Sequence, residues 1–196
     1  MKRSSIILLS VAGILILAIF WGVSKYNGLV TKDEAVSGQW ANVENQYQRR
    51  ADLIPNLVAT VKGYASHESE TLEGVVAARA KATQITVDPN NLTPEKLQQY
   101  QAAQGELSSA LGKLLMITEN YPELKANQNF LELQAQLEGT ESRIATERGR
   151  FNELSKDFNA TVRKFPTNIV ASLAGFEKKA YFEAEEGSEK APEVKF

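Results

Sequence analysis

The chain has 196 residues, of which 43% are hydrophobic and 23% charged, and a formal net charge of −2. This length suits one compact domain with appendages. The nearly balanced charge excludes a nucleic-acid-binding domain that works through a strongly basic surface. The absence of cysteine excludes disulfides, thiolate metal sites and thiol catalysis. The single histidine, His67, has only Glu70 at helical spacing as a second ligand, so we expect no metal site and no cofactor.

The N-terminal segment has the composition of a membrane anchor. Ile6 to Val23 is a run of eighteen uncharged residues, and about 20 helical residues cross the hydrocarbon core of a bilayer. The run ends at Phe20 and Trp21 rather than at a small-residue cleavage site. We therefore expect a short basic tail over 1–5 and an uncleaved transmembrane helix over 6–24, with a cleaved signal peptide as the alternative.

The charges beside this span favour one orientation. Lys2, Arg3 and the α-amino group precede it. Two lysines follow it, next to two acidic residues: Lys25, Lys32, Asp33 and Glu34. Because positive charge is retained on the cytoplasmic side, we expect a cytoplasmic N-terminus and an exported body.

The residues after the span have the periodicity of a long helix. Apolar side chains recur every three or four positions, as on one helix face: Val36, Trp40, Val43, Tyr47, Ile54, Leu57, Val61, Ala65, Leu72, Val75 and Ala78. Pro55 removes the amide that would bond to the carbonyl of Ala51, and Asp52 could cap a restarted helix. We expect one helix over 33–81 that is kinked or broken near 51–54.

Two further long helices are predicted, so the expected fold class is all-α. Thr93 is placed to cap the second helix, which Pro122 ends. The third runs from near Asn129 to Phe165, before Pro166. A short amphipathic helix over 167–176 and an acidic tail over 183–196, expected to be disordered, complete the chain.

Two separate polar blocks resemble the LemA family of bacterial membrane proteins. The segments that carry the resemblance are Tyr26-Asn27-Gly28-Leu29-Val30, residues 46–56 (QYQRRADLIPN) running into 57–65, residues 129–145, and Phe165-Pro166. Phe151-Asn152 and Phe158-Asn159 stand where the family often has Tyr-Asn pairs. The resemblance covers about residues 26–182. It implies a single-pass protein of the bacterial cell (inner) membrane, with an antiparallel bundle of three or four helices over 25–182 and no established enzymatic activity.

Polar residues gather around the proline of the first block: Arg49, Arg50, Asp52, Pro55 and Asn56. They could form a recognition or anion-binding site, because a kink exposes backbone groups and arginine offers a bidentate fork. In the structural interpretation, Asp52 and Asn56 satisfy the backbone that Pro55 frees, and Arg50 pairs with a glutamate of the bundle. A facing polar layer that fixes the register is predicted on the third helix: Gln136, Glu138, Thr140, Glu141 and Arg143.

The predicted helix lengths suggest a surface for self-association. If three helices run up, down and up with short connections, the lower half of the first helix has no intrachain partner. The apolar stripe on that half consists of Val36, Trp40, Val43 and Tyr47. We therefore expect a homo-oligomer, or contact with another membrane protein. In the competing picture, the chain folds at Pro55 and this stripe packs on its own bundle.

These inferences predict a membrane-anchored helical-bundle scaffold or accessory protein of the bacterial envelope, with the lipid bilayer as a partner and no role in nucleic-acid binding. The alternative is an adaptor that recognises a membrane protease, transporter or sensor through residues 49–56. No glycine-rich phosphate loop, nucleophile elbow or paired-carboxylate motif stands out. We therefore expect no catalytic residue.

Overall fold

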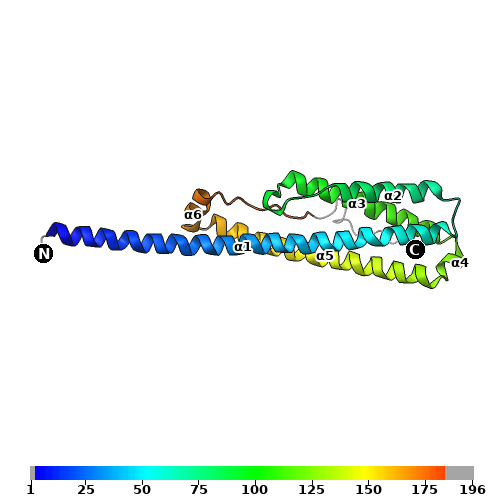
Figure 1. The fold of residues 1–196 in the computed structure, drawn as a ribbon, viewed down its shortest axis with the longest axis horizontal. Helices are drawn as coiled ribbons and strands as arrows, with labels where there is room; N and C mark the ends of the chain where they lie inside the picture. Colours follow the sequence, from blue (N-terminus) through cyan, green and yellow to red (C-terminus); the bar gives the residue numbers. More distant parts are fainter. Residues whose placement is uncertain (1–2, 184–196) are drawn as a thin grey trace, which may run out of the picture.

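The structure is a computed structural model that describes residues 3–183. Its longest element, α1 (Arg3–Lys62), is a single helix of 60 residues, which extends for about 90 Å at 1.5 Å per residue. The first part of α1 projects alone, and the rest runs along the other helices (Figure 1). The expected acidic tail over 183–196 lies outside the described residues, apart from Glu183.

Pro55 lies inside α1 and does not end it. Of the two expectations for 51–54, a kink or a break, the break is therefore wrong. A proline ring removes one backbone donor from the helix, which here leaves the carbonyl of Ala51 without its amide partner. That carbonyl accepts a hydrogen bond of 2.7 Å from Nε of Arg79 instead. A side chain from another helix therefore replaces the missing backbone bond, and α1 continues for two more turns.

The chain reverses direction at residues 63–68, inside the segment predicted as one helix over 33–81. After α1 ends, α2 (Ser69–Gln84) runs back beside it (Figure 1). The backbone N–H groups of Gly63 and Tyr64 each bond to the carbonyl three residues earlier, which is the tighter spacing common in the last turn of an α-helix. The predicted first helix is thus two antiparallel helices.

The later helices agree closely with the predicted ones, and the fold is all-α as expected. Thr93 caps α3 by accepting a hydrogen bond of 3.3 Å from the backbone of Lys96. Asn127 caps α5 in the same way, with a bond of 3.1 Å from the backbone of Phe130. The remaining elements are η1 (Pro89–Asn91), α3 (Pro94–Thr118), α4 (Pro122–Lys125), α5 (Gln128–Arg163) and α6 (Thr167–Ala174).

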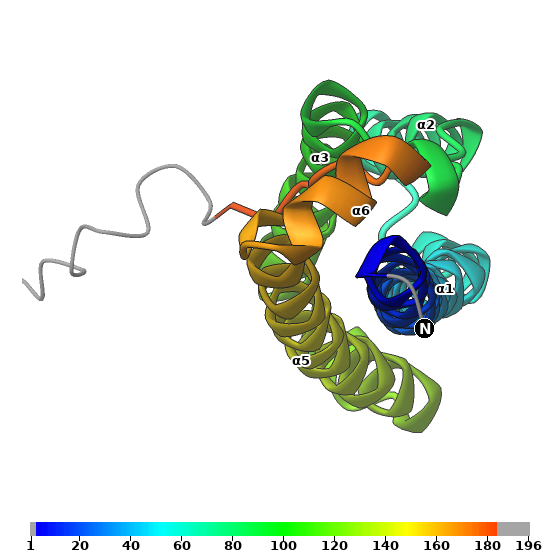
Figure 2. The ribbon, with the colours of Figure 1, turned by 90° about the vertical axis from the view of Figure 1, so that its left-hand side faces the viewer.

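Helices α1, α2, α3 and α5 form an antiparallel bundle, in which α1 packs mainly on α5 and α2 on α3 (Figures 1 and 2). We call the end that carries α6 proximal, because it adjoins the apolar start of α1, and the end that carries α4 distal. Helix α5 runs from the distal to the proximal end, beside α1 over the length of the bundle (Figure 1). Residues 175–183 then return along the bundle as a segment without helix, the C-terminal strap.

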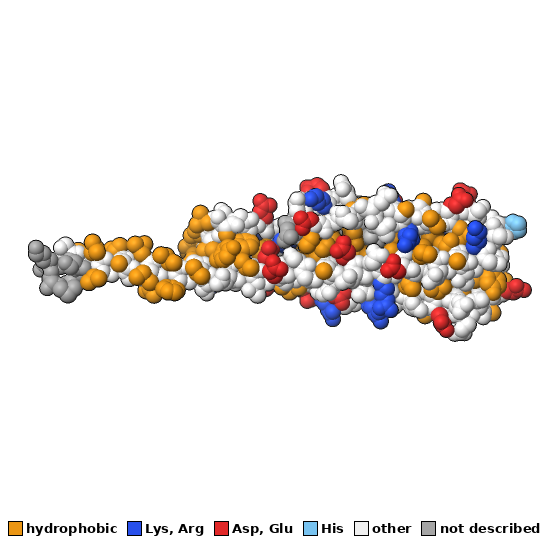
Figure 3. Space-filling model, in the orientation of Figure 1, with side chains coloured by type: hydrophobic (Ala, Val, Ile, Leu, Met, Phe, Trp, Pro, Cys, Tyr) orange, Lys and Arg blue, Asp and Glu red, His pale blue; other side chains and the backbone are white. Residues whose placement is uncertain are grey.

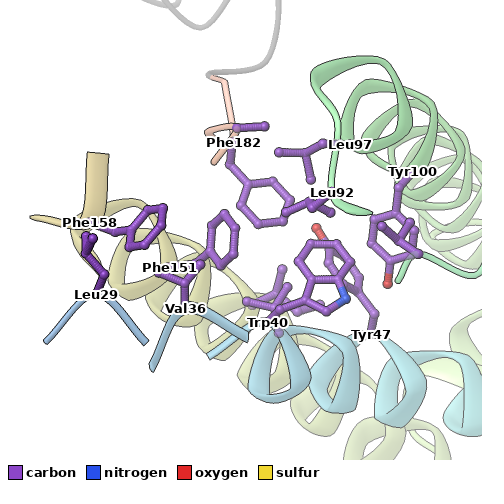
Figure 4. Close-up of a cluster of buried hydrophobic side chains, with 14 of the residues drawn as sticks. Leu29, Val36, Trp40, Tyr47, Leu92, Leu97, Tyr100, Phe151, Phe158 and Phe182 are labelled. Atoms are coloured by element: carbon purple, nitrogen blue, oxygen red, sulfur yellow. The ribbon is translucent and has the colours of Figure 1, made fainter. Parts of the chain in front are cut away.

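The interior divides into two clusters of buried apolar side chains. The proximal cluster joins α1, α3, α5 and the C-terminal strap (Figure 4) and is built from Leu29, Val36, Trp40, Val43, Tyr47, Val87, Leu92, Leu97, Tyr100, Ile144, Phe151, Phe158, Ala171, Ala180 and Phe182. The distal cluster contains side chains from each of the helices α1, α2, α3, α4 and α5: Ile54, Leu57, Val61, Val75, Leu107, Leu114, Leu124 and Phe130. Because the proximal cluster needs the strap, the folded unit extends to residue 182.

Candidate functional site

The first part of α1 has the properties of a membrane span. Its most apolar window of 18 residues has a mean hydropathy of 2.5, and none of that window is buried. At the bundle side of the span, Nζ of Lys25 lies 6.0 Å from the centre of the Trp21 ring. Tryptophan and lysine are typical of the boundary between hydrocarbon and headgroups. These features fit a membrane protein whose bundle begins directly after its anchor.

Two ion pairs hold α1 where it enters the bundle. Lys32 pairs with Asp157 of α5. Asp33 pairs with Lys179 of the C-terminal strap at 2.6 Å, and both of these side chains are largely shielded from solvent. Partly buried pairs are screened less by salt than exposed ones. These two ion pairs connect the start of the bundled part of α1 to α5 and to the C-terminal strap.

The stripe predicted to mediate self-association lies in the proximal core. All four side chains are buried: Val36, Trp40, Val43 and Tyr47. The prediction that this face lacks an intrachain partner is wrong, because the additional reversal at 63–68 sends α5 back along the same part of α1. The competing expectation that the stripe packs on its own bundle is correct, although no fold at Pro55 is involved. Contact between copies through these side chains would require the core to open.

Trp40 is the centre of this core, with 1% of its surface exposed. Its ring stacks on Phe182 at a centroid distance of 5.9 Å. It meets Tyr100 and Phe151 edge-on, at 5.3 and 5.8 Å (Figure 4). Such tilted aromatic pairs stabilise a core beyond the area that they bury. Trp40 therefore joins α1, α3, α5 and the strap at one point.

Two asparagines of α5 hold the C-terminal strap over this core. The amide of Asn159 donates to the carbonyl of Lys179 at 2.9 Å and accepts from its N–H at 2.8 Å. Asn152, seven residues earlier, makes the same pair of bonds to Phe182, at 2.9 and 2.8 Å. The phenylalanine that precedes each asparagine is buried. Each Phe-Asn pair thus supplies one ring to the core and one amide to the strap.

Arg50 is buried to 1% exposure and joins three helices. Its Nη1 donates to Ser108 Oγ at 2.8 Å and to Glu141 Oε1 at 2.5 Å. Its Nη2 donates to the side chain and the backbone carbonyl of Gln104, at 2.6 and 3.2 Å. The expected pairing of Arg50 with a glutamate of the bundle is confirmed. Because both terminal nitrogens are engaged inside the bundle, Arg50 does not present a free fork to an external anion.

The other residues of the polar motif are exposed on α1: Arg49, Asp52, Pro55 and Asn56. Asp52 lies within the helix and accepts a hydrogen bond of 2.8 Å from Gln48, so the predicted capping role is wrong. The expectation that Asp52 and Asn56 satisfy the freed backbone is also wrong, since Arg79 bonds to the carbonyl of Ala51. The motif therefore divides into one buried arginine and an exposed polar surface.

Two residues of the predicted facing layer lie near this motif. Glu141 pairs with Arg50, and Gln136 lines an open groove together with Asn56. Thr140 is buried, and its hydroxyl donates to the carbonyl of Gln136 at 2.7 Å. The side chains of Gln136, Glu138 and Arg143 are exposed. Glu141 and Gln136 thus lie beside α1, while Glu138 and Arg143 are on the exposed surface of α5.

The α3 side of the Arg50 network was not predicted from the sequence. Gln104 is buried and also donates to the carbonyl of Ala82 at 3.3 Å. A signal was present, because Gln104 stands on the apolar stripe of its helix, four residues after Tyr100 and three before Leu107. A polar residue at such a position indicates a buried partner.

An apolar groove of about 380 Å³ lies between α1 and α2 near the distal end. Apolar side chains form most of its wall, together with Lys62 and Glu73: Val58, Leu72, Val76, Ala77 and Ala80. Val76 is itself exposed. The groove is open and has the shape and polarity of a site for an apolar segment of a partner.

The only histidine is exposed at the reversal between α1 and α2. Among residues 3–183, no three histidine, cysteine, aspartate or glutamate side chains come together in a way that could hold a metal ion.

Comparison with known proteins identifies the family. The family model described as "LemA family" matches residues 39–196. The chain is 28% identical over 183 residues to Magnetosome protein MamQ 2 of Paramagnetospirillum magneticum, covering 81% of this chain and 65% of that protein. It is 26% identical over 175 residues to MamQ of Magnetospirillum gryphiswaldense, covering 81% and 64%. With Protein LemA of Metamycoplasma hominis it shares 26% identity over 175 residues, covering 88% and 76%.

The chain thus spans slightly less than two thirds of the length of its MamQ relatives. The matched region contains most of the bundle, from the middle of α1 onward. The chain belongs to the LemA family.

Proposed function

We propose that this protein is a membrane-anchored helical scaffold or accessory protein of the bacterial cell envelope. The anchor is the apolar start of α1, and the scaffold is the bundle of α1, α2, α3 and α5. The single observation that carries the proposal is the continuity of α1, which passes from an exposed apolar span into a buried core without a loop.

A continuous helix gives the bundle a defined position above the membrane. A flexible linker would let a domain sample many orientations, whereas a packed helix transmits the direction of the span to the bundle. Confinement to a surface also raises the effective concentration of copies and partners, so weak lateral contacts become sufficient. The exposed polar side chains of α1 and α5 provide such contacts in this proposal, rather than the buried stripe around Trp40.

Cysteine cross-linking in intact membranes tests the scaffold role, because the chain has no cysteine of its own. Single cysteines at exposed positions, such as Arg49→Cys, Asn56→Cys and Arg143→Cys, are treated with a short thiol-reactive cross-linker. A cysteine at the buried position Val43 serves as the control. We expect one discrete product, composed of copies of this chain or of this chain with one partner. Failure of every exposed position to give a product would contradict the scaffold role.

We further propose that the bundle lies on the exported side of the inner membrane, since Lys2 and Arg3 precede the span. A reporter that is active only outside the cytoplasm, fused after Phe196, tests this orientation. Activity of the fusion is expected. Activity of a cytoplasm-specific reporter at the same position would reverse the orientation.

The second candidate is an adaptor that binds another membrane protein, and the groove between α1 and α2 favours it. Val76→Glu places a charge in the groove without disturbing the core, because Val76 is exposed. The matched control is Ala59→Glu, which places the same charge on an exposed position of α1. Loss of a specific cross-linked partner in the groove variant alone would favour the adaptor. If the groove variant instead loses only the cross-linked products between copies of this chain, the result would favour the scaffold.

A further inference from the structure

Three large apolar side chains are exposed together at the proximal end of the bundle. Phe165 is 81% exposed, Ile169 51% and Leu173 84%. Ile169 and Leu173 are four residues apart in α6 and therefore lie on one side of that helix, and Phe165 is in the turn directly before it. An apolar patch formed this way is unusual on the surface of a soluble domain and indicates a contact with a partner or a membrane.

The local fold keeps this patch facing outward. The opposite side of α6 is buried through Thr167 and Ala171, where the helix packs on α1 and α5. Gly175 ends α6 with a φ of 75°, and the backbone of Phe176 then bonds back to the carbonyl of Ala171 at 3.0 Å. A left-handed glycine of this kind reverses the chain at a helix end. Helix α6 is therefore held with its apolar side away from the core.

The patch lies at the level where α1 leaves the membrane. The ring of Phe176 is 5.9 Å from that of Tyr26, and Tyr26 follows the last apolar residue of the span, Val23, by three residues. That separation is about 4.5 Å along the helix. The headgroup layer on each side of the hydrocarbon core is about 5–8 Å thick. Helix α6 thus lies beside the part of α1 that crosses this layer, and Figure 3 shows the two apolar surfaces as nearly continuous.

The charged residues next to the patch suit an anionic lipid surface. Those exposed beside it in the chain are mainly basic: Arg163, Lys164, Glu177 and Lys178. Lys25 of α1, beside Trp21, is exposed at a similar level. Basic residues next to an apolar helix face are typical of helices that lie in the membrane interface.

We propose that Phe165, Ile169 and Leu173 insert into the interfacial layer of the bilayer and form a second membrane contact beside the α1 span. A single helical anchor leaves the bundle free to tilt in any direction with α1. A second contact to one side of that axis opposes every tilt that would lift α6 out of the interface, and so restricts how the bundle is inclined to the membrane. Helix α6 is thereby the element that orients the scaffold.

The test uses the full chain in vesicles of phosphatidylcholine and phosphatidylglycerol. A spin label is attached to Leu173→Cys or, as the matched control, to Met116→Cys, an exposed apolar position near the distal end. Collisions of each label with oxygen, which is enriched in lipid, are compared with collisions with a water-soluble nickel chelate. We expect position 173 to lose most of its access to the chelate and gain access to oxygen, while position 116 remains open to the chelate.

Equal access of the chelate to both positions would overturn the proposal. Shielding of position 173 that disappears when the ratio of lipid to protein is raised would also overturn it, because a second copy would then cover the patch. Either result leaves the anchor itself unaffected, since the protein would still be found in the vesicles. Loss of the protein from the vesicles would instead contradict the membrane-anchored function on which this inference rests.

Discussion

The guanidinium of Arg79 on α2 replaces the hydrogen bond that Pro55 removes from α1, by donating to the carbonyl of Ala51 at 2.7 Å. Ala51 is buried, so water has little access to its carbonyl. An unpaired polar group in such a place destabilises a fold. The pairing therefore explains how a helix of 60 residues tolerates an internal proline.

Removing this donor should destabilise the bundle. We expect Arg79→Met to lower the free energy of unfolding by about 1–3 kcal/mol, as for a buried acceptor left unpaired. In the background of Pro55→Ala, where residue 55 regains its backbone donor, the same change should have a smaller effect. The four proteins to compare are the unchanged chain, each single variant and the double variant. Their chemical unfolding in mild detergent, followed by circular dichroism, measures this coupling. Equal effects in both backgrounds would contradict the proposed replacement.

The Arg50 network predicts unequal roles for two neighbouring arginines. Arg50→Met leaves the side chain of Gln104 without its donor and should destabilise the fold by about 1–3 kcal/mol. Arg49→Met, on the exposed side of α1, should change stability by no more than about 0.5 kcal/mol. Thermal unfolding of the two variants in parallel compares them. Similar stability of both variants would show that the network does not support the bundle.

The asparagine clamps predict that the C-terminal strap shields Trp40. In a Trp21→Phe background, Trp40 is the only tryptophan, so its fluorescence reports on the proximal core. Asn152→Asp removes the donor to the carbonyl of Phe182 and should increase quenching of Trp40 by acrylamide. Asn45→Asp, at an exposed position of α1, is the control and should leave quenching unchanged. No difference between the two variants would mean that the clamp does not hold the strap in place.

Two buried tyrosines predict a loss of stability at alkaline pH. Burial raises the pKa of Tyr47, and burial and the neighbouring Tyr47 raise the pKa of Tyr100, above the ordinary value of 10.0. Above that pH the unfolded chain releases these protons and the folded chain retains them, so the free energy of unfolding falls as pH rises. Tyr47→Phe and Tyr100→Phe should each flatten this dependence. Unfolding curves measured from neutral pH to above pH 10 test it, and an unchanged slope in both variants would contradict it.

Much of the fold could be predicted from the sequence because its signals are local. The uncharged run from Ile6 to Val23, the cap at Thr93 and the prolines that end helices act within a few residues. They identify the anchor and the bounds of α3 and α5 closely. The pairing of Arg50 with a glutamate was also predictable, because a charge on an apolar stripe requires a partner.

The reversal at 63–68 could not be predicted from periodicity. Leu72 and Val75 follow Val61 and Ala65 at helical spacing, so the apolar stripe continues in phase across the turn. Pro55 gave a stronger but misleading signal, since the residue that compensates for it, Arg79, lies on another helix. Because this turn was not predicted, every later helix was predicted to run in the opposite direction. The stripe around Trp40 was therefore predicted to lack the partners that it has in the structure.

The strap was missed because it is held by contacts distant in sequence. Its one local signal is an alternation at the end of the described chain, where Ala180 and Phe182 are buried and Tyr181 and Glu183 are exposed. The seven-residue spacing of Asn152 and Asn159 indicates a second row of polar contacts on α5. From the sequence alone, neither signal shows that the strap and the two asparagines contact each other.

The distance between spin labels on α1 tests most directly that one helix joins the membrane span to the bundle. Cysteines at Lys25 and Ala59, both exposed, carry the labels in the full-length protein in lipid nanodiscs. A continuous helix through Pro55 predicts one narrow distance distribution centred near about 50 Å. A broad distribution at clearly shorter distances would show a hinge in α1, and would contradict the account of a bundle held rigidly on its anchor.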